Sequence, residues 1–210
     1  FDANIEKLSA VEGITSRKIN EINKAQQNIN LDKELNCARK NKIDIITILD
    51  KNYPDNLKNI YDPPVVLYVK GELLDYDHNS IAIVGSRRAS FYGLSVANNL
   101  SSQLSNLGIT IVSGLARGID TASHKGALST KGRTIAVLGN GLLNIYPPEN
   151  KKLADEISHN GAVISEFNLE MPPLAINFPR RNRIISGFSL GVVVVEAARN
   201  SGALITANLA

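Results

Sequence analysis

Short apolar runs rich in β-branched residues recur from about residue 80 onward, and a turn of glycine or polar residues follows each one. Runs without alternating polar positions are typical of strands buried on both faces, as in a parallel sheet. The segments between the runs are long enough to form crossover helices. The pattern therefore predicts an α/β fold with a doubly wound, Rossmann-like and mostly parallel sheet, whose ligands bind beyond the carboxyl ends of the strands. The five runs are Ile81–Val84, Ile109–Ser113, Thr134–Leu138, Ala162–Ser165 and Val192–Val195.

The first 40 residues are polar, with apolar positions at helical spacing, which predicts a small helical unit. The segment Val11–Thr15 is similar to a helix-hairpin-helix, but Thr15 stands where that motif needs its second glycine. We therefore expect a packing or protein-contact module here rather than a phosphate site. The apolar positions are Ile5, Leu8, Val11, Ile14, Ile19 and Ile22.

Two further strands are predicted before the parallel runs, over Ile43–Ile48 and Val65–Gly71, with proline-containing turns between them. We expect a small helical domain of SAM-like or degenerate helix-hairpin-helix type over residues 1–42, and an extended Rossmann-like domain over residues 43–210. The only methionine is Met171, and the last residues resemble the opening of a helix without a C-cap. We therefore expect a fragment trimmed at both ends, with the Rossmann-like domain truncated at its C-terminal end.

Charge is distributed unevenly along the chain. The net charge is +3, which divides into +5 for residues 80–210 and −2 for residues 1–79, so the basic half favours a polyanionic partner. With 43% hydrophobic residues and no apolar run of transmembrane length, the composition is that of a globular protein, and we expect no membrane partner. Cys37 is the only cysteine, which excludes an internal disulfide and a cysteine-based zinc site and favours a reducing, cytoplasmic location.

The run Phe178–Gly187 concentrates arginines at the predicted start of a helix, because Pro179 suits the first helical turn. Cations are unfavourable at that end of the helix dipole. A bound phosphate removes the conflict, since backbone N–H groups and guanidinium forks both bind anions. Phe178 adds an aromatic face of the kind on which bases stack. We favour this anion site over the alternative, in which the arginines pair with surface carboxylates. The arginines are Arg180, Arg181 and Arg183.

Glycines and arginines also follow the other predicted strands. Glycine lets the backbone approach a ligand and turn its N–H groups toward it. Because the carboxyl ends of parallel strands share one edge, we expect the arginines to converge on one rim. Glu166 and Glu196, at strand ends, are expected to pair with arginines and hold them in place. Tyr92 and Tyr146 are expected either to pack at the rim or to provide rings on which bases stack. The arginines that follow the first and second parallel strands are Arg87, Arg88 and Arg117.

A nucleotide cofactor site is one alternative explanation of the glycine-rich turns. Gly139-x-Gly141 begins like a dinucleotide fingerprint, but Asn144 stands where the third glycine belongs, and the chain has no Gly-Lys-Ser/Thr run of Walker type. We therefore expect neither a nucleotide cofactor nor a metal.

A hydrolytic active site is the second alternative explanation of the residues at the strand ends. Asp120 and His124 are four residues apart, so one helix face would carry both, and Ser113 ends the neighbouring strand. No nucleophile-elbow sequence surrounds this serine. We favour the alternative in which Asp120 offsets the free N–H groups at a helix start and His124 is hydrogen-bonded at the rim.

Five stretches of the sequence, named at the end of this paragraph, together resemble the DNA-processing protein A family (DprA/Smf) over about residues 50–210. The resemblance implies a non-enzymatic, single-stranded DNA-binding protein with a DNA pocket at the carboxyl edge of its sheet. It also implies that such a protein protects incoming strands, loads the RecA recombinase during natural transformation, and acts as a homodimer. The stretches that carry the resemblance are Gly85–Gly93, Ser113–Asp120, Tyr146–Pro147, Phe178–Gly187 and Ser201–Ala207.

Matching positions in the family nominate nine residues for DNA binding in this chain. Contacts to the recombinase and the partner subunit that depend on the family's more C-terminal parts are not expected of this fragment. An alternative on a related fold is a nucleotide phosphoribohydrolase, in which a strand-end glutamate does acid–base work, but the Pro-Gly-Gly loop of that family is absent. The nominated residues are Arg87, Arg88, Ser113, Gly114, Arg117, Phe178, Arg180, Asn182 and Arg183.

Overall fold

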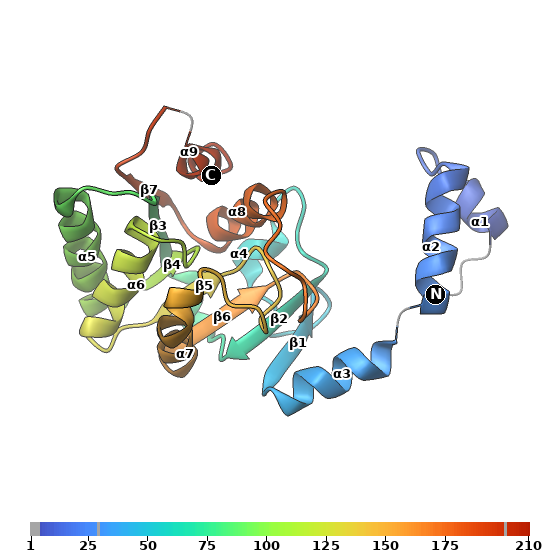
Figure 1. Cartoon of the computed structure of the whole chain (residues 1–210), viewed down its shortest axis with the longest axis horizontal. Helices are drawn as coiled ribbons and strands as arrows, with labels where there is room; N and C mark the ends of the chain where they lie inside the picture. The colour runs from blue at the N-terminus through green and yellow to red at the C-terminus, as the bar shows by residue number, and fades with distance from the viewer. Residues whose placement is uncertain (1–4, 29, 200) are drawn as a thin grey trace. The chain divides into compact units, whose positions relative to one another are not determined.

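The apolar runs of the sequence form the strands of one seven-stranded sheet in the computed structural model, which describes residues 5–28, 30–199 and 201–210 (Figure 1). Strands pair in the order β1-β2-β6-β5-β4-β3-β7. From β6 to β7 all neighbours are parallel, whereas β2 is antiparallel to both β1 and β6. The predicted α/β, mostly parallel, Rossmann-like fold is confirmed. The strands are β1 (Ile43–Thr47), β2 (Val66–Gly71), β3 (Ser80–Gly85), β4 (Thr110–Ser113), β5 (Thr134–Val137), β6 (Gly161–Ser165) and β7 (Val192–Val195).

The chain divides into two compact units, Phe1–Cys37 and Ala38–Ala210. The first contains α1 (Ile5–Ser9), α2 (Ser16–Asn28) and most of α3 (Leu31–Lys40), so the helical character predicted for the first 40 residues is present. The turn between α1 and α2 places Gly13 at a φ of +84°, a backbone conformation that favours glycine. The second unit contains the sheet, and the boundary predicted after residue 42 falls in the turn between α3 and β1.

Helices cover both faces of the sheet. One set of helices lies in a layer on one face, and a second set packs on the opposite face (Figure 1). The alternation of side chains along β3 explains the two layers, because Ala82 and Val84 face one side and Ile83 faces the other. The first layer is α5 (Phe91–Asn106), α6 (Ile119–Ser129) and α7 (Lys151–Asn160); the second is α4 (Asp55–Lys58), α8 (Asn177–Phe188) and α9 (Gly202–Ala207).

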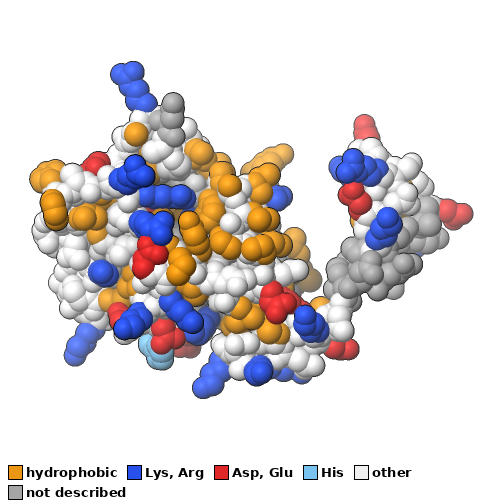
Figure 2. All heavy atoms as spheres, viewed as in Figure 1, with side chains coloured by type: hydrophobic (Ala, Val, Ile, Leu, Met, Phe, Trp, Pro, Cys, Tyr) orange, Lys and Arg blue, Asp and Glu red, His pale blue; other side chains and the backbone are white. Residues whose placement is uncertain are grey.

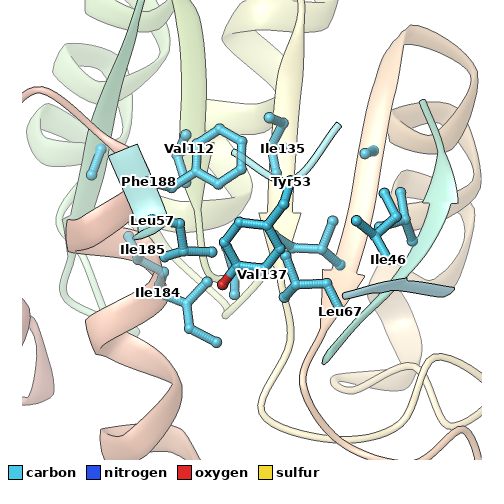
Figure 3. Packing of buried hydrophobic residues seen from close by; sticks show 14 of the residues in the cluster. Ile46, Tyr53, Leu57, Leu67, Val112, Ile135, Val137, Ile184, Ile185 and Phe188 are labelled. Carbon is cyan, nitrogen blue, oxygen red and sulfur yellow. The ribbon is translucent and has the colours of Figure 1, made fainter. Parts of the chain in front are cut away.

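The larger core lies between the sheet and the layer of α4 and α8. Tyr53 lies at its centre among Leu57, Leu67 and Val137 (Figure 3). The Tyr53 hydroxyl donates to the Pro64 carbonyl at 2.7 Å, which satisfies its only polar atom. Burial raises the pKa of Tyr53 to about 12, so this phenol stays neutral. This packing holds α8 against the strands whose carboxyl ends carry the motifs.

Candidate functional site

A cleft of about 650 Å³ opens at the carboxyl ends of the parallel strands. Its walls come from the turn after β3, the loop between β4 and α6, the first turns of α8, and α9. This is the edge at which the sequence predicts a ligand, and it is the place where open α/β sheets bind theirs. The lining residues used below are Arg87, Asp120, Tyr146, Phe178, Arg181 and Asn182.

Three exposed arginines lie at or beside this cleft. Arg87 lines it, Arg88 follows in the same turn, and Arg180 lies in the first turn of α8. Within the described part of the chain, no carboxylate pairs with any of the three. Figure 2 shows Lys and Arg side chains gathered on the face turned to the viewer, beside a hydrophobic surface. Their positive charge is therefore available to an anion.

Phe178 forms an aromatic wall beside these arginines. The guanidinium carbon of Arg87 is 5.5 Å from the centroid of the Phe178 ring, and the Tyr146 ring centroid is 5.8 Å from it. Gly139 makes room for this ring, because a Cβ at that position would lie 2.9 Å from Cδ1 of Phe178. Tyr146 therefore belongs to the site wall, whereas Tyr92 is 80% exposed on α5.

Arg181 has a different role from its neighbour Arg180. Its side chain is buried beneath the cleft, where Nη1 donates to the Gly114 carbonyl at 2.8 Å and also to the Val137 carbonyl. Burial lowers the pKa of Arg181 to about 10, and the nearby Asp120 carboxylate opposes that shift. Arg181 therefore remains charged at neutral pH and ties α8 to the ends of β4 and β5.

Asp120 organises the loop after β4 from below. Its Oδ2 accepts hydrogen bonds from the N–H of Gly114 at 3.1 Å and of Ala116 at 3.2 Å. Burial raises the pKa of Asp120, while Arg181 and these two N–H groups act in the opposite direction. A Cβ on Gly114 would lie 2.4 Å from Nη1 of Arg181, so the glycine is required by close packing. Asp120 was expected to offset the free N–H groups at the start of its helix; it binds instead two N–H groups of the loop that precedes α6.

Ser113 and Gly114, two of the residues nominated as DNA contacts, are both buried beneath the cleft. Ser113 is fully buried, and its hydroxyl donates to the Ile83 carbonyl at 2.6 Å. The N–H of Gly114 is bound by Asp120 and its carbonyl by Arg181, so neither group is free for a ligand. These residues shape the floor of the cleft rather than its surface.

Arg183 also lies away from the cleft. Its two terminal nitrogens donate to the two carboxylate oxygens of Glu166, both at 2.7 Å, and its Nε donates to Asp62 Oδ2 at 2.9 Å. The alternative in which arginines pair with carboxylates is therefore correct for Arg183, and the predicted pairing of Glu166 is confirmed. Arg183 binds the end of β6 and the loop before β2 to α8, so in this structure its guanidinium is engaged by two carboxylates and not open to a phosphate.

We expect Arg183→Ala to lower the free energy of unfolding by about 1–3 kcal/mol, because Glu166, whose side chain is 18% exposed, loses both of its charged hydrogen bonds. Urea denaturation of Arg183→Ala, Glu166→Ala and the double variant measures the coupling between the two side chains. Strict additivity of the two single effects would contradict this pairing.

Two nominated residues lie at the edge of the cleft with partners of their own. Asn182 is nearly buried in the wall and donates through Nδ2 to the Gly202 carbonyl at 3.2 Å, which joins α8 to α9. Arg117 lies at the rim, about half exposed, in an ion pair with Glu149. This pair and a hydrogen bond to Tyr146 raise the pKa of Arg117.

Two expectations about acid–base residues were wrong. Glu196 does not pair with an arginine; its carboxylate accepts from the N–H of Ser90 at 2.9 Å and from the Ser90 hydroxyl at 2.6 Å, at the start of α5. His124 is not at the rim; it is fully buried, and its Nδ1 lies 2.7 Å from the Thr134 hydroxyl. Burial lowers the pKa of His124 to about 3, so the ring is neutral at physiological pH. Each member of the proposed Ser113–Asp120–His124 set is thus bound to another partner.

No cluster of three histidine, cysteine, aspartate or glutamate side chains suited to a metal ion occurs in the part of the chain that the structure describes. In the same part, none of the helices combines the length and the apolar character that a membrane span requires.

Sequence comparison places the chain among proteins of DNA processing. A family model described as DNA recombination-mediator protein A matches residues 44–210. Protein Smf of Escherichia coli is 52% identical over 159 residues, which cover 75% of this chain and 42% of that protein. The DNA processing protein DprA of Bacillus subtilis is 46% identical over 178 residues, which cover 84% of this chain and 60% of that protein. The chain therefore spans roughly half the length of these relatives.

Two solved structures of such proteins share the fold. DNA processing protein A from Streptococcus pneumoniae is 42% identical, with a TM-score of 0.82 over 93% of this chain and 68% of that one. The Helicobacter pylori protein, described in terms of its single-stranded DNA binding mode, is 30% identical, with a TM-score of 0.72 over 80% of this chain and 75% of that one. The resemblance seen in the motifs is confirmed, and the chain belongs to the DNA recombination-mediator protein A family, the DprA/Smf proteins.

Proposed function

We propose that this chain binds single-stranded DNA with little sequence preference and without catalysing a reaction on it. The observation that carries the proposal is a set of exposed arginines, with no carboxylate partner among the described residues, at a cleft with an aromatic wall. Guanidinium groups bind phosphates whatever the base sequence, and aromatic rings stack on unpaired bases. The single-stranded DNA binding mode described for the Helicobacter pylori relative supports the same ligand.

We assign roles to the nominated residues according to their exposure. Phosphates contact the three exposed arginines, and a base or sugar contacts Phe178, with Tyr146 behind it. Arg117 stays paired with Glu149 in the wild type and gains a phosphate contact only when that carboxylate is removed. Of the remaining nominated residues, Ser113, Gly114 and Asn182 shape the floor and wall of the cleft, whereas Arg183 anchors α8 outside it.

The wider role is a proposal about the whole protein, since this chain spans only part of its relatives. We propose that the intact protein is a cytoplasmic homodimer that protects incoming single strands and loads the RecA recombinase onto them during natural transformation. In this role it needs no cofactor, because charge and stacking supply the binding energy.

Titration of single-stranded and duplex DNA over a range of salt concentrations tests the proposed function. Three phosphate contacts predict that the logarithm of the association constant falls with the logarithm of salt concentration at a slope of about 2. Binding that is indifferent to salt, or tighter to duplex, would contradict the proposal. Release of free base from nucleoside monophosphates would instead favour the phosphoribohydrolase alternative.

We expect Glu149→Gln to strengthen single-strand binding about fivefold at 0.1 M salt and to steepen the salt slope by about 0.7, because it frees Arg117 for a phosphate. The bond from Arg117 lowers the pKa of Glu149, so this carboxylate competes with phosphate at neutral pH and stops competing only when acid protonates it. An Arg117→Ala background should abolish the gain. A gain that persists in that background would show that Glu149 acts by another route.

A further inference from the structure

A second cavity, of about 760 Å³, lies beside the cleft in the same unit. It is a groove bounded by α7, by the loop that follows β5, and by β2 and β6. Its floor is apolar, with Leu142, Ala154 and Val163 buried, and Leu143 is 38% exposed along it. None of the roles assigned so far uses this groove.

The groove carries unpaired positive charge. Lys151 and Lys152 line it from the first turn of α7, both are exposed, and no carboxylate pairs with either one in the described part of the chain. A third lysine, Lys70, lines the same groove with its ammonium 3.1 Å from Asp155 Oδ1. The two free ammonium groups above an apolar floor suit a ligand with spaced negative charges and apolar or aromatic parts between them.

The groove is continuous with the DNA cleft through the Arg117–Glu149 ion pair. Glu149 lines the groove, whereas Arg117 lines a small recess together with Arg87, Tyr146 and Phe178 of the cleft. The chain itself makes the same link, because Tyr146 and Pro147 line the recess and the next residue, Pro148, lines the groove. Basic side chains extend over this face from the strand ends to α7 (Figure 2).

We propose that this groove is a second subsite that holds the part of the same DNA strand extending beyond the cleft, with Lys151 and Lys152 on its phosphates and the apolar floor beneath its sugars or bases. The inference rests on the proposed function of the cleft. A single strand is flexible enough to pass the rim at Arg117 and enter the groove, whereas a duplex is stiff on this length scale. The subsite thus extends the DNA track and adds to the preference for single strands.

The test measures binding against strand length. Oligothymidylates from about 4 to about 16 nucleotides, the range of site sizes in single-strand-binding folds, are titrated at several salt concentrations. The wild-type slope should rise with length as the groove fills. Lys151→Ala/Lys152→Ala should reduce the slope by about 1.4 for the longest strand and leave the shortest unchanged. The charge-matched control Lys125→Ala/Lys131→Ala changes exposed lysines in and just after α6 that line neither the cleft nor the groove, and it should match the wild type at every length.

The remaining outcomes separate this inference from the function on which it rests. Failure of the wild type to bind any strand would refute the proposed function itself. Normal wild-type binding with a wild-type slope for the lysine variant on the longest strand would refute the second subsite and leave the groove to another partner, such as an acidic peptide. An equal loss at every length would place the lysines in the primary cleft. Lys151→Arg/Lys152→Arg should restore the slope, which confirms that charge is responsible.

Discussion

Replacing Arg181 with methionine should lower the free energy of unfolding by about 3–5 kcal/mol. The side chain is 4% exposed, and its guanidinium is the donor to the buried carbonyls of Gly114 and Val137. Methionine fills much of the volume but supplies no donor, so both carbonyls lose a partner and Asp120 loses the nearest positive charge. Urea denaturation measures the change, with the midpoint and the slope of the transition both recorded.

The adjacent residue provides the matched control. Arg180 is in the same turn of α8 but is exposed and has no carboxylate partner among the residues that the structure describes, so Arg180→Met should change the free energy of unfolding by no more than about 0.5 kcal/mol. Equal effects of the two substitutions would refute the distinction between a buried, structural Arg181 and an exposed, ligand-binding Arg180.

The loss in Arg181→Met should also depend on pH. Burial already raises the pKa of Asp120 in the folded protein, and removing Arg181 raises it further. Between the ordinary carboxyl pKa near 4 and this raised value, the folded state binds more protons than the unfolded state, so stability falls as pH rises. The deficit relative to wild type should therefore be largest at neutral pH and smaller in acid. Adding Asp120→Asn should remove the pH-dependent part.

Much of this arrangement could be predicted from the sequence, because hydrophobic pattern and glycine placement act locally. All seven strands follow from apolar runs, and the cleft lies at the carboxyl ends that the runs define. The sequence also contains a signal that distinguishes the buried arginine of α8 from the exposed one. Arg181 repeats at helical spacing with the core residues Ile184, Ile185 and Phe188, which marks it as inward-facing.

Other features depend on contacts that no local pattern reveals. Arg183 meets Glu166 and Asp62 from segments far away in the chain, so its pairing required knowledge of the strand order. Glu196 follows its strand as expected, yet it reaches the start of α5 because β7 pairs with β3, which brings it to Ser90. A strand-end carboxylate has several partners within reach, and only the assembled sheet decides among them.

Replacing Arg87, Arg88 and Arg180 together with alanine should weaken single-strand binding about a hundredfold at 0.1 M salt and reduce the salt slope by about 2, since each phosphate contact accounts for about 0.7 of that slope. The three side chains are exposed and unpaired in the described part of the chain, so the melting temperature should stay within a few degrees of wild type. The Lys125→Ala/Lys131→Ala control removes charge from exposed residues that do not line the cleft and should keep the wild-type slope. The loss should be similar for all base sequences, because phosphate contacts carry no sequence information.

Two outcomes would contradict this prediction. A triple variant that binds normally while remaining folded would place the DNA elsewhere on the protein. A loss shared by the lysine control would indicate only a response to net charge.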